Sequence, residues 1–173
     1  MKHCHYLLIL LLALLTASCK DRTPVIETGP DKVALVKENM VNANRVVIQS
    51  ENTQIQSYID RHGWQMRQLP CSACYCQTAE GNGAPICTDD NVVVTYRLEA
   101  LDGSPFYTHQ VDTLVVGRRQ VTVALDELLQ QLRYGSKARL IAPSNAAYGV
   151  TGDGDRVPSR TVVIYIIENI SKL

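Results

Sequence analysis

The stretch YGSKARLIAPSNAAYGVTGDGDRVPSRTVVIYII, residues 134–167, decides the fold. Two apolar runs, 138–141 and 162–167, enclose a segment rich in Gly, Pro, Asn and Asp, residues 143–160. Short apolar runs bounded by turn residues predict β-strands. Long loops in compact domains usually carry function, so we expect residues 143–160 to contribute to a site.

The chain before this stretch continues the pattern of strands and turns. Strands are predicted at 92–96, 98–101 and 114–116, with an Asp102-Gly103 turn after the second. A helical stripe then follows and closes at Gly135; its apolar members are Leu125, Leu128, Leu129 and Leu132. A sheet with one short helix packed against it is an α+β domain, which we place at residues 89–173.

Several motifs occur in a fixed order along this domain. They are Val-Val-Thr-Tyr96, Asp102-Gly103-x-x-Phe106, Gly117, Tyr134-Gly135-Ser136-Lys137-Ala138, Ala147-Tyr148-Gly149 and Val157-Pro158. In this order they resemble the FKBP-type peptidyl-prolyl cis-trans isomerase family. The resemblance implies an antiparallel sheet wrapped on one short helix, and an enzyme that isomerises X-Pro bonds. The substrates would be proline-containing polypeptides.

The implied chemistry needs no cofactor, metal or nucleophile. Rotation about an X-Pro bond crosses a barrier of about 20 kcal/mol set by amide resonance. An apolar pocket that binds the twisted amide better than either planar isomer lowers this barrier, helped by a donor to the carbonyl. The resemblance assigns Tyr148, Tyr96 and Phe106 to catalysis, with Tyr148 as the donor. It assigns substrate binding to Val121, Thr122, Leu125, Val157 and Tyr165.

The chain departs from the family pattern at several pocket positions. Tyr107 stands where the family usually has an aspartate, so a carboxylate credited with polarising the pocket is expected to be missing. Leu125 replaces the common tryptophan, and Asp153 and Arg156 stand where His and Ile are common. We therefore expect low isomerase activity. The alternative is a catalytically weak FKBP-like binding or chaperone module.

The composition agrees with an apolar site. Lys and Arg together number 17, as do Asp and Glu, which argues against a nucleic-acid binder that relies on a basic field. Hydrophobic residues make up 46% of the chain, enough for one core. Oligomeric state stays open.

The N-terminal residues predict an export signal. Residues 6–15 form an apolar run too short to span a bilayer, and Thr16-Ala17-Ser18 leads into Cys19. This resembles a bacterial lipobox, with signal peptide 1–18 and lipidation at Cys19; the alternative is an ordinary signal cut near Ala17. We expect an exported lipoprotein in the outer membrane, facing the periplasm, similar to FKBP-type lipoproteins of Bacteroidota, including those grouped with gliding motility.

Two further segments precede the domain. Residues 19–30 are expected to form a tether, and residues 31–66 a helical lead-in of one or two helices, with Ser50 as the cap of a second. A Cys-rich loop is expected at 67–88, with Cys71, Cys74, Cys76 and Cys87. Export favours disulfides, with Cys76–Cys87 preferred; zinc and free thiols are the alternatives.

Overall fold

The computed structural model describes residues 30–173, so the signal peptide, Cys19 and nearly all of the predicted tether lie outside the described residues. The chain divides into two units, Met1–Met40 and Val41–Leu173. Across residues 30–173 we find no helix with the length and hydropathy needed to cross a bilayer.

One continuous helix forms the lead-in. Helix α2 runs Pro30–His62, and Ser50 lies within it and caps nothing. The helix ends before Gly63, whose φ of 62° is the left-handed conformation that glycine adopts at least cost. Residues 64–66, expected in the helical segment, lead instead into the first strand.

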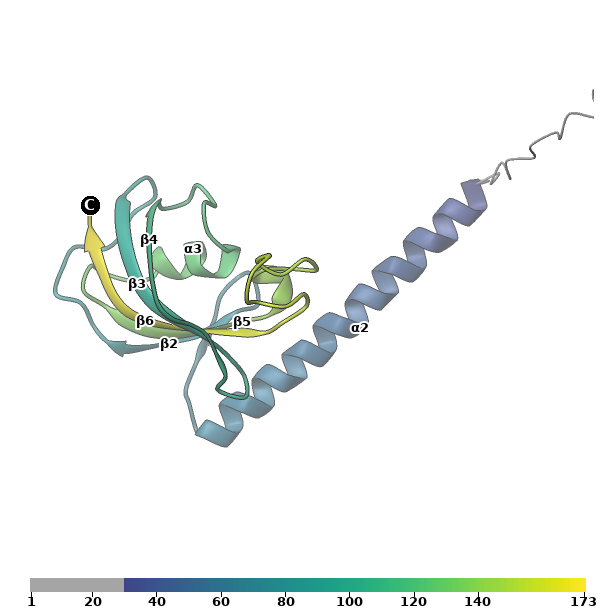
Figure 1. The fold of residues 1–173 in the computed structure, drawn as a ribbon, viewed down its shortest axis with the longest axis horizontal. Coiled ribbons are helices and arrows are strands. Elements are labelled where there is room, and N and C mark those ends of the chain that lie inside the picture. Colours follow the sequence, from purple (N-terminus) through teal and green to yellow (C-terminus); the bar gives the residue numbers. More distant parts are fainter. Residues whose placement is uncertain (1–29) are drawn as a thin grey trace, which may run out of the picture. The chain divides into compact units, whose positions relative to one another are not determined.

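The second unit is built on a six-stranded antiparallel sheet in the order β1-β2-β5-β6-β3-β4. The strands are β1 Arg67–Gln68, β2 Cys74–Ala79, β3 Asn91–Ala100, β4 Pro105–Val115, β5 Lys137–Ala142 and β6 Val163–Lys172. The sheet curves around helix α3, Val123–Leu129 (Figure 1). The predicted α+β class, with an antiparallel sheet on one short helix, is confirmed.

Each face of the sheet has its own core. The face toward α3 buries the larger cluster, which includes Leu125, Leu128 and Leu140. The opposite face packs against the C-terminal half of α2 through Ile55 and Ile59. Complete burial of one such side chain contributes about 1.5–3 kcal/mol, so this half of α2 is bound firmly to the sheet.

Strands β3 and β4 do not keep a constant register. Tyr96 pairs with Gln110, but Leu98 pairs with Tyr107, so β4 carries one extra residue between these pairs. Such a bulge reverses the side-chain alternation of the strand beyond it. Residues of opposite parity on β4 can therefore face the same side of the sheet.

The Cys-rich segment is not a simple loop, and this corrects the expected boundary at residue 89. Strand β2 lies within residues 67–88 and pairs with β5 in the main sheet. The period-2 pattern is hidden because β2 reads CYCQTA, in which only Tyr75 is a large apolar residue on the α3 face.

The four cysteines are free thiols, so the preferred Cys76–Cys87 disulfide is not formed. Cys71 packs on the α3 side and Cys74 on the α2 side, so the sheet lies between them. Cys76 pairs with Arg139 within the sheet, whereas Cys87 lies in the turn before β3. Within residues 30–173, no three His, Cys, Asp or Glu side chains are placed to hold a metal ion.

Candidate functional site

The site is built around three tyrosines on the α3 face of the sheet. Tyr96 on β3 and Tyr165 on β6 lie on neighbouring strands, with ring centroids 5.3 Å apart and planes tilted by 54°. The Tyr165 hydroxyl is 2.9 Å from Thr122 Oγ1, directly before α3. Both rings are buried, so their orientation is fixed by packing and by these polar contacts.

Tyr148 reaches the same place from the loop 143–160, which joins β5 to β6. A 3₁₀ turn, η1 Ser144–Ala146, starts this loop, and Gly149 follows Tyr148 with a φ of 66°. The ring is half-buried and packs against the main core. Burial raises the pKa of the Tyr148 hydroxyl; the neighbouring Tyr165 hydroxyl opposes this effect, and Asp153 and Asp112 reinforce it. Tyr148 therefore remains a protonated donor at neutral pH.

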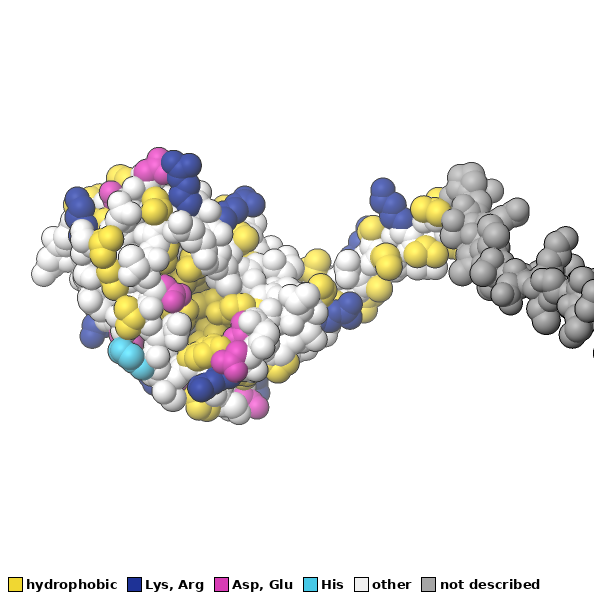
Figure 2. Space-filling model, turned by 45° about the horizontal axis from the view of Figure 1, so that its top comes forward, with side chains coloured by type: hydrophobic (Ala, Val, Ile, Leu, Met, Phe, Trp, Pro, Cys, Tyr) yellow, Lys and Arg dark blue, Asp and Glu magenta, His cyan; other side chains and the backbone are white. Residues whose placement is uncertain are grey.

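An apolar floor lies beneath these phenols. Leu125, on α3, and Val157, in the loop, are buried, whereas Phe106 and Val121 are half-buried and pack on the same cluster. The surface is hollowed on this side of the domain, and hydrophobic side chains line the hollow with acidic side chains near its rim (Figure 2). Such a surface suits an apolar ring with few polar groups attached.

Asp112 supplies the carboxylate that the sequence was expected to lack. Tyr96 donates its hydroxyl to Asp112 Oδ2 at 2.8 Å. Burial, and then this hydrogen bond, raise the pKa of Tyr96 far above its ordinary value. The expectation failed because the carboxylate comes from a different position on β4. Asp112 pairs with Val94, two residues before Tyr96 on the same face, and so lies diagonally across from the phenol.

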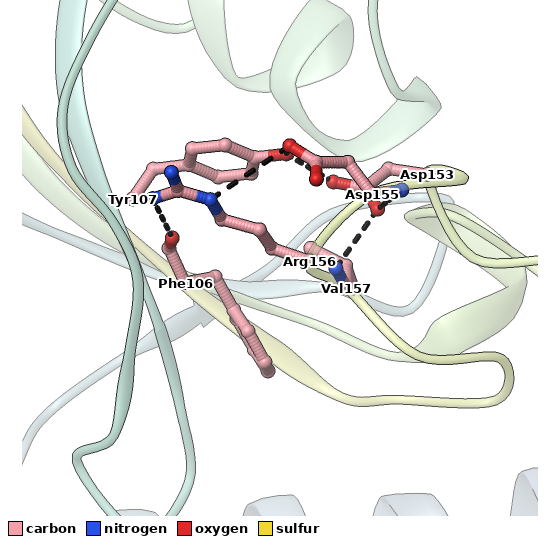
Figure 3. Close-up of polar contacts among 6 residues, drawn as sticks. All are labelled: Phe106, Tyr107, Asp153, Asp155, Arg156 and Val157. Atoms are coloured by element: carbon pink, nitrogen blue, oxygen red, sulfur yellow. Dashed lines mark hydrogen bonds and ion pairs between the residues drawn. The ribbon is translucent and has the colours of Figure 1, made fainter.

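Tyr107 links β4 to the loop across the rim of the site. Its hydroxyl donates to Asp153 Oδ2 at 2.6 Å, and Asp153 Oδ1 accepts the Val157 amide at 2.8 Å (Figure 3). Burial alone would raise the pKa of Asp153, but the Tyr107 hydroxyl and the loop amides lower it. The Asp153 carboxylate raises the pKa of Tyr107 to about 12.

Arg156 completes this rim contact. Its guanidinium lies 5.2 Å from the Tyr107 ring centroid and donates to the Phe106 carbonyl at 3.3 Å (Figure 3). Asp153 and Arg156, which the sequence marked as departures, thus hold the loop against β4.

The structure places all eight predicted catalytic and substrate-binding residues in, or in contact with, the core on the α3 face of the sheet. Seven belong to one hydrophobic cluster and Thr122 joins it through Tyr165; the seven are Tyr96, Phe106, Val121, Leu125, Tyr148, Val157 and Tyr165. Their roles stay predictions. Sequence reasoning missed two polar partners, the Asp112 carboxylate and the Tyr107 hydroxyl. No local motif marks either, since both depend on the β4 bulge and on the loop conformation.

The comparisons with known proteins agree with this geometry. Residues 84–170 match the family model described as FKBP-type peptidyl-prolyl cis-trans isomerase. The chain is 32% identical over 108 residues to the macrophage infectivity potentiator of Trypanosoma cruzi, covering 60% of this chain and 55% of that protein. It is 33% identical over 92 residues to the probable FKBP-type peptidyl-prolyl cis-trans isomerase FkpA of Neisseria meningitidis serogroup B, covering 51% and 34%.

Solved structures show the same fold. A peptidyl-prolyl cis-trans isomerase from Pseudomonas syringae pv. tomato superposes with a TM-score of 0.61 at 24% identity, covering 74% of this chain and 96% of that one. AtFKBP13 superposes with a TM-score of 0.55 at 20% identity, covering 64% and 100%. The chain spans 55% and 34% of the length of the two curated relatives. The family match covers half of the chain, and the chain therefore belongs to the FKBP-type peptidyl-prolyl cis-trans isomerase family.

Proposed function

We propose that this chain catalyses cis–trans isomerisation of X-Pro bonds in proline-containing polypeptides. The observation that carries the proposal is the half-buried Tyr148 phenol beside Tyr96 and Tyr165, next to an apolar floor. The proline ring would pack on Phe106, Leu125 and Val157. The Tyr148 hydroxyl would donate to the carbonyl that precedes the proline.

Catalysis follows from differential binding. When the amide twists, its carbonyl and nitrogen lose conjugation, so the twisted form lacks the resonance that stabilises both planar isomers. Transfer to a dry, apolar surface costs the twisted amide little solvation free energy. A donor held at the position that the carbonyl oxygen reaches in the twisted form can bind it without reorganisation. Tyr165 and Tyr96 restrict where the Tyr148 ring can lie, so the donor is in place before the substrate arrives.

The Asp112 contact supports turnover above the low level that the sequence predicts. Tyr96 is 4% exposed, and its hydroxyl has a charged acceptor at 2.8 Å, so the ring is held in one orientation. The missing carboxylate was one of several departures on which the expectation of weak activity rested. With Asp112 in this place, that reason no longer applies.

A different observation favours the second candidate, a weakly catalytic binding or chaperone module. The Tyr107–Asp153 hydrogen bond spans the rim and ties the loop to β4. If this bond restricts entry of a polypeptide, substrate would be held at the rim and turned over slowly. The two candidates differ in turnover number, not in the residues that bind.

The test is cis–trans exchange of a proline peptide, measured by NMR, together with refolding of a protein limited by proline isomerisation. We expect Tyr148→Phe to lower kcat/KM about tenfold. This is less than the roughly 10²–10³-fold loss for a donor to an oxyanion, because a twisted amide develops no negative charge on its oxygen. Tyr58→Phe, on α2 and across the sheet, is the matched control and should leave the rate unchanged. No acceleration by the parent protein at micromolar concentration would refute the enzyme.

We further propose that the protein is a lipoprotein anchored through Cys19 in the outer membrane and assists folding in the periplasm. The support is the apolar run followed by small residues and Cys19. Incorporation of labelled palmitate into the parent, and its absence in Cys19→Ser, tests the anchor. Incorporation of label into the Cys19→Ser variant, or no incorporation into the parent protein, would contradict the lipid anchor. The proposed similarity to FKBP-type lipoproteins of Bacteroidota, including those grouped with gliding motility, is supported by the order of signal, tether, helical lead-in and FKBP-like domain.

A further inference from the structure

A buried acidic side chain lies outside the site described above. Glu51 on α2 is 5% exposed, and both of its carboxylate oxygens are bound by one residue of the loop. The Ser144 amide donates to Oε2 at 2.8 Å, and the Ser144 hydroxyl donates to Oε1 at 2.6 Å. Both residues belong to the same unit of the chain, Val41–Leu173.

Ser144 anchors the Tyr148 segment by backbone hydrogen bonds. Its carbonyl accepts the Ala147 amide at 3.1 Å and the Gly149 amide at 2.7 Å, so the backbone on both sides of Tyr148 is bonded to it. The Arg160 amide then donates to the Gly149 carbonyl at 2.8 Å and closes the loop at its other end. A displacement of Ser144 therefore moves the Tyr148 ring.

Packing does not explain the carboxylate. Ile55 and Ile59 already attach this part of α2 to the sheet through apolar contacts. A buried carboxylate is costly unless it is fully hydrogen-bonded, and an apolar residue in its place is often neutral or stabilising. The carboxylate fixes the orientation of Ser144, because its two acceptor oxygens bind two donors of that single residue.

We propose that Glu51 is a positioning residue for the isomerase site, holding the Tyr148 loop to helix α2 through Ser144. This inference rests on the proposed function, since its consequence is the rate at which a bound X-Pro amide rotates. Glu51 itself touches no substrate. Its action passes through the η1 turn to the Tyr148 hydroxyl.

The chemistry of the contact predicts a graded series of variants. Glu51→Ala removes both acceptors. Glu51→Gln keeps one acceptor oxygen for the Ser144 amide. Its NH₂ can donate to the Ser144 hydroxyl, which then accepts a hydrogen bond where it donated one before. We expect kcat to fall about tenfold in Glu51→Ala and less than about threefold in Glu51→Gln, since small displacements of a positioned group have effects of this size or larger. KM should stay within about twofold, because the apolar floor is untouched.

A second readout does not depend on activity. Hydrogen exchange of the Ser144 and Gly149 amides reports local opening of the loop. We expect Glu51→Ala to speed exchange at both amides at least about tenfold, and Glu51→Gln to restore part of the protection. Glu38→Ala is the matched control, since Glu38 is the same residue type on the same helix and is exposed. It should change neither exchange nor kcat.

The outcomes separate this inference from the proposed function. A role in stability alone predicts that Glu51→Ala lowers the melting temperature while kcat and loop exchange, measured well below it, stay at the parent values; this result would overturn the inference. Unchanged exchange with a lowered kcat would overturn the route through Ser144. An inactive parent would refute the proposed function and the catalytic consequence, while faster exchange in Glu51→Ala would still establish the contact between α2 and the loop.

Discussion

The contact between Tyr96 and Asp112 can be tested by removing each partner and then both. In Asp112→Ala the Tyr96 hydroxyl loses the acceptor that lies 2.8 Å away, while its ring stays buried. In Tyr96→Phe the carboxylate loses one donor, but Asp112 is half-buried and water can reach it. The double variant leaves no buried polar atom unpaired.

The magnitudes follow from this asymmetry. A buried polar group left without a partner costs about 1–3 kcal/mol, whereas a hydrogen bond lost at a solvated group costs about 0.5–1.5 kcal/mol. We expect Asp112→Ala to lower the free energy of unfolding by about 2 kcal/mol and Tyr96→Phe by about 1 kcal/mol. Since the orphaned hydroxyl is absent from the double variant, the two losses should not add, and the coupling should be about 1–2 kcal/mol.

The assay is urea unfolding at neutral pH. Trp64 is the only tryptophan of the chain and packs on the α2 face of the sheet, so its fluorescence reports unfolding without direct contact with the altered site. Circular dichroism at the same urea concentrations checks that the transition is two-state. Asp112→Asn, which retains an acceptor oxygen, is the control and should cost less than Asp112→Ala. Additive losses within about 0.3 kcal/mol would refute the proposed pairing.

Three other changes test the loop and the helix. Gly152→Ala should destabilise the loop and lower kcat/KM, because Gly152 has a φ of 73° and an added Cβ would collide with the Val157 carbonyl; normal turnover would contradict this. Ile55→Ala should lower the free energy of unfolding by about 2–5 kcal/mol through loss of packing between α2 and the sheet, measured in urea. The pKa of Asp153 is lower in the folded state than its unfolded value of about 3.9. The ionised carboxylate therefore stabilises the fold above this value, and the stabilisation is lost as the pH falls through the lower folded pKa. On acidification from about pH 4 to pH 2, the free energy of unfolding should fall less in Asp153→Asn than in the parent.

The fold was predictable where large apolar residues mark the elements. Strand β6 and helix α3 carry runs of Ile, Val and Leu with the period of their element, so their existence and type followed directly from the sequence. Strand β2 was missed because its period is carried by Tyr75 between two cysteines, which the Cys content led us to interpret as loop. The sequence left open whether α2 is one helix or two, because serine is a common N-cap residue and Ser50 suggested a second start.

The apolar members of the site were predictable because the family resemblance places them by position, and positions survive sequence divergence. The polar partners were not, because they depend on which face a residue of β4 occupies. Tyr107 and Asp112 lie five positions apart in the sequence, and a regular strand would place them on opposite faces of the sheet.

The extra residue in β4 between Tyr107 and Gln110 removes this conflict. It shifts the side-chain alternation by one residue, so that Tyr107, opposite Leu98, and Asp112, opposite Val94, share the face on which Tyr96 lies. Each then finds a different partner, Asp153 for Tyr107 and Tyr96 for Asp112. The bulge therefore allows one strand to hold the loop by a phenol and to orient the pocket by a carboxylate. A position-by-position comparison with the family sees only the aspartate replaced by tyrosine, because it assumes that equal positions face the same way.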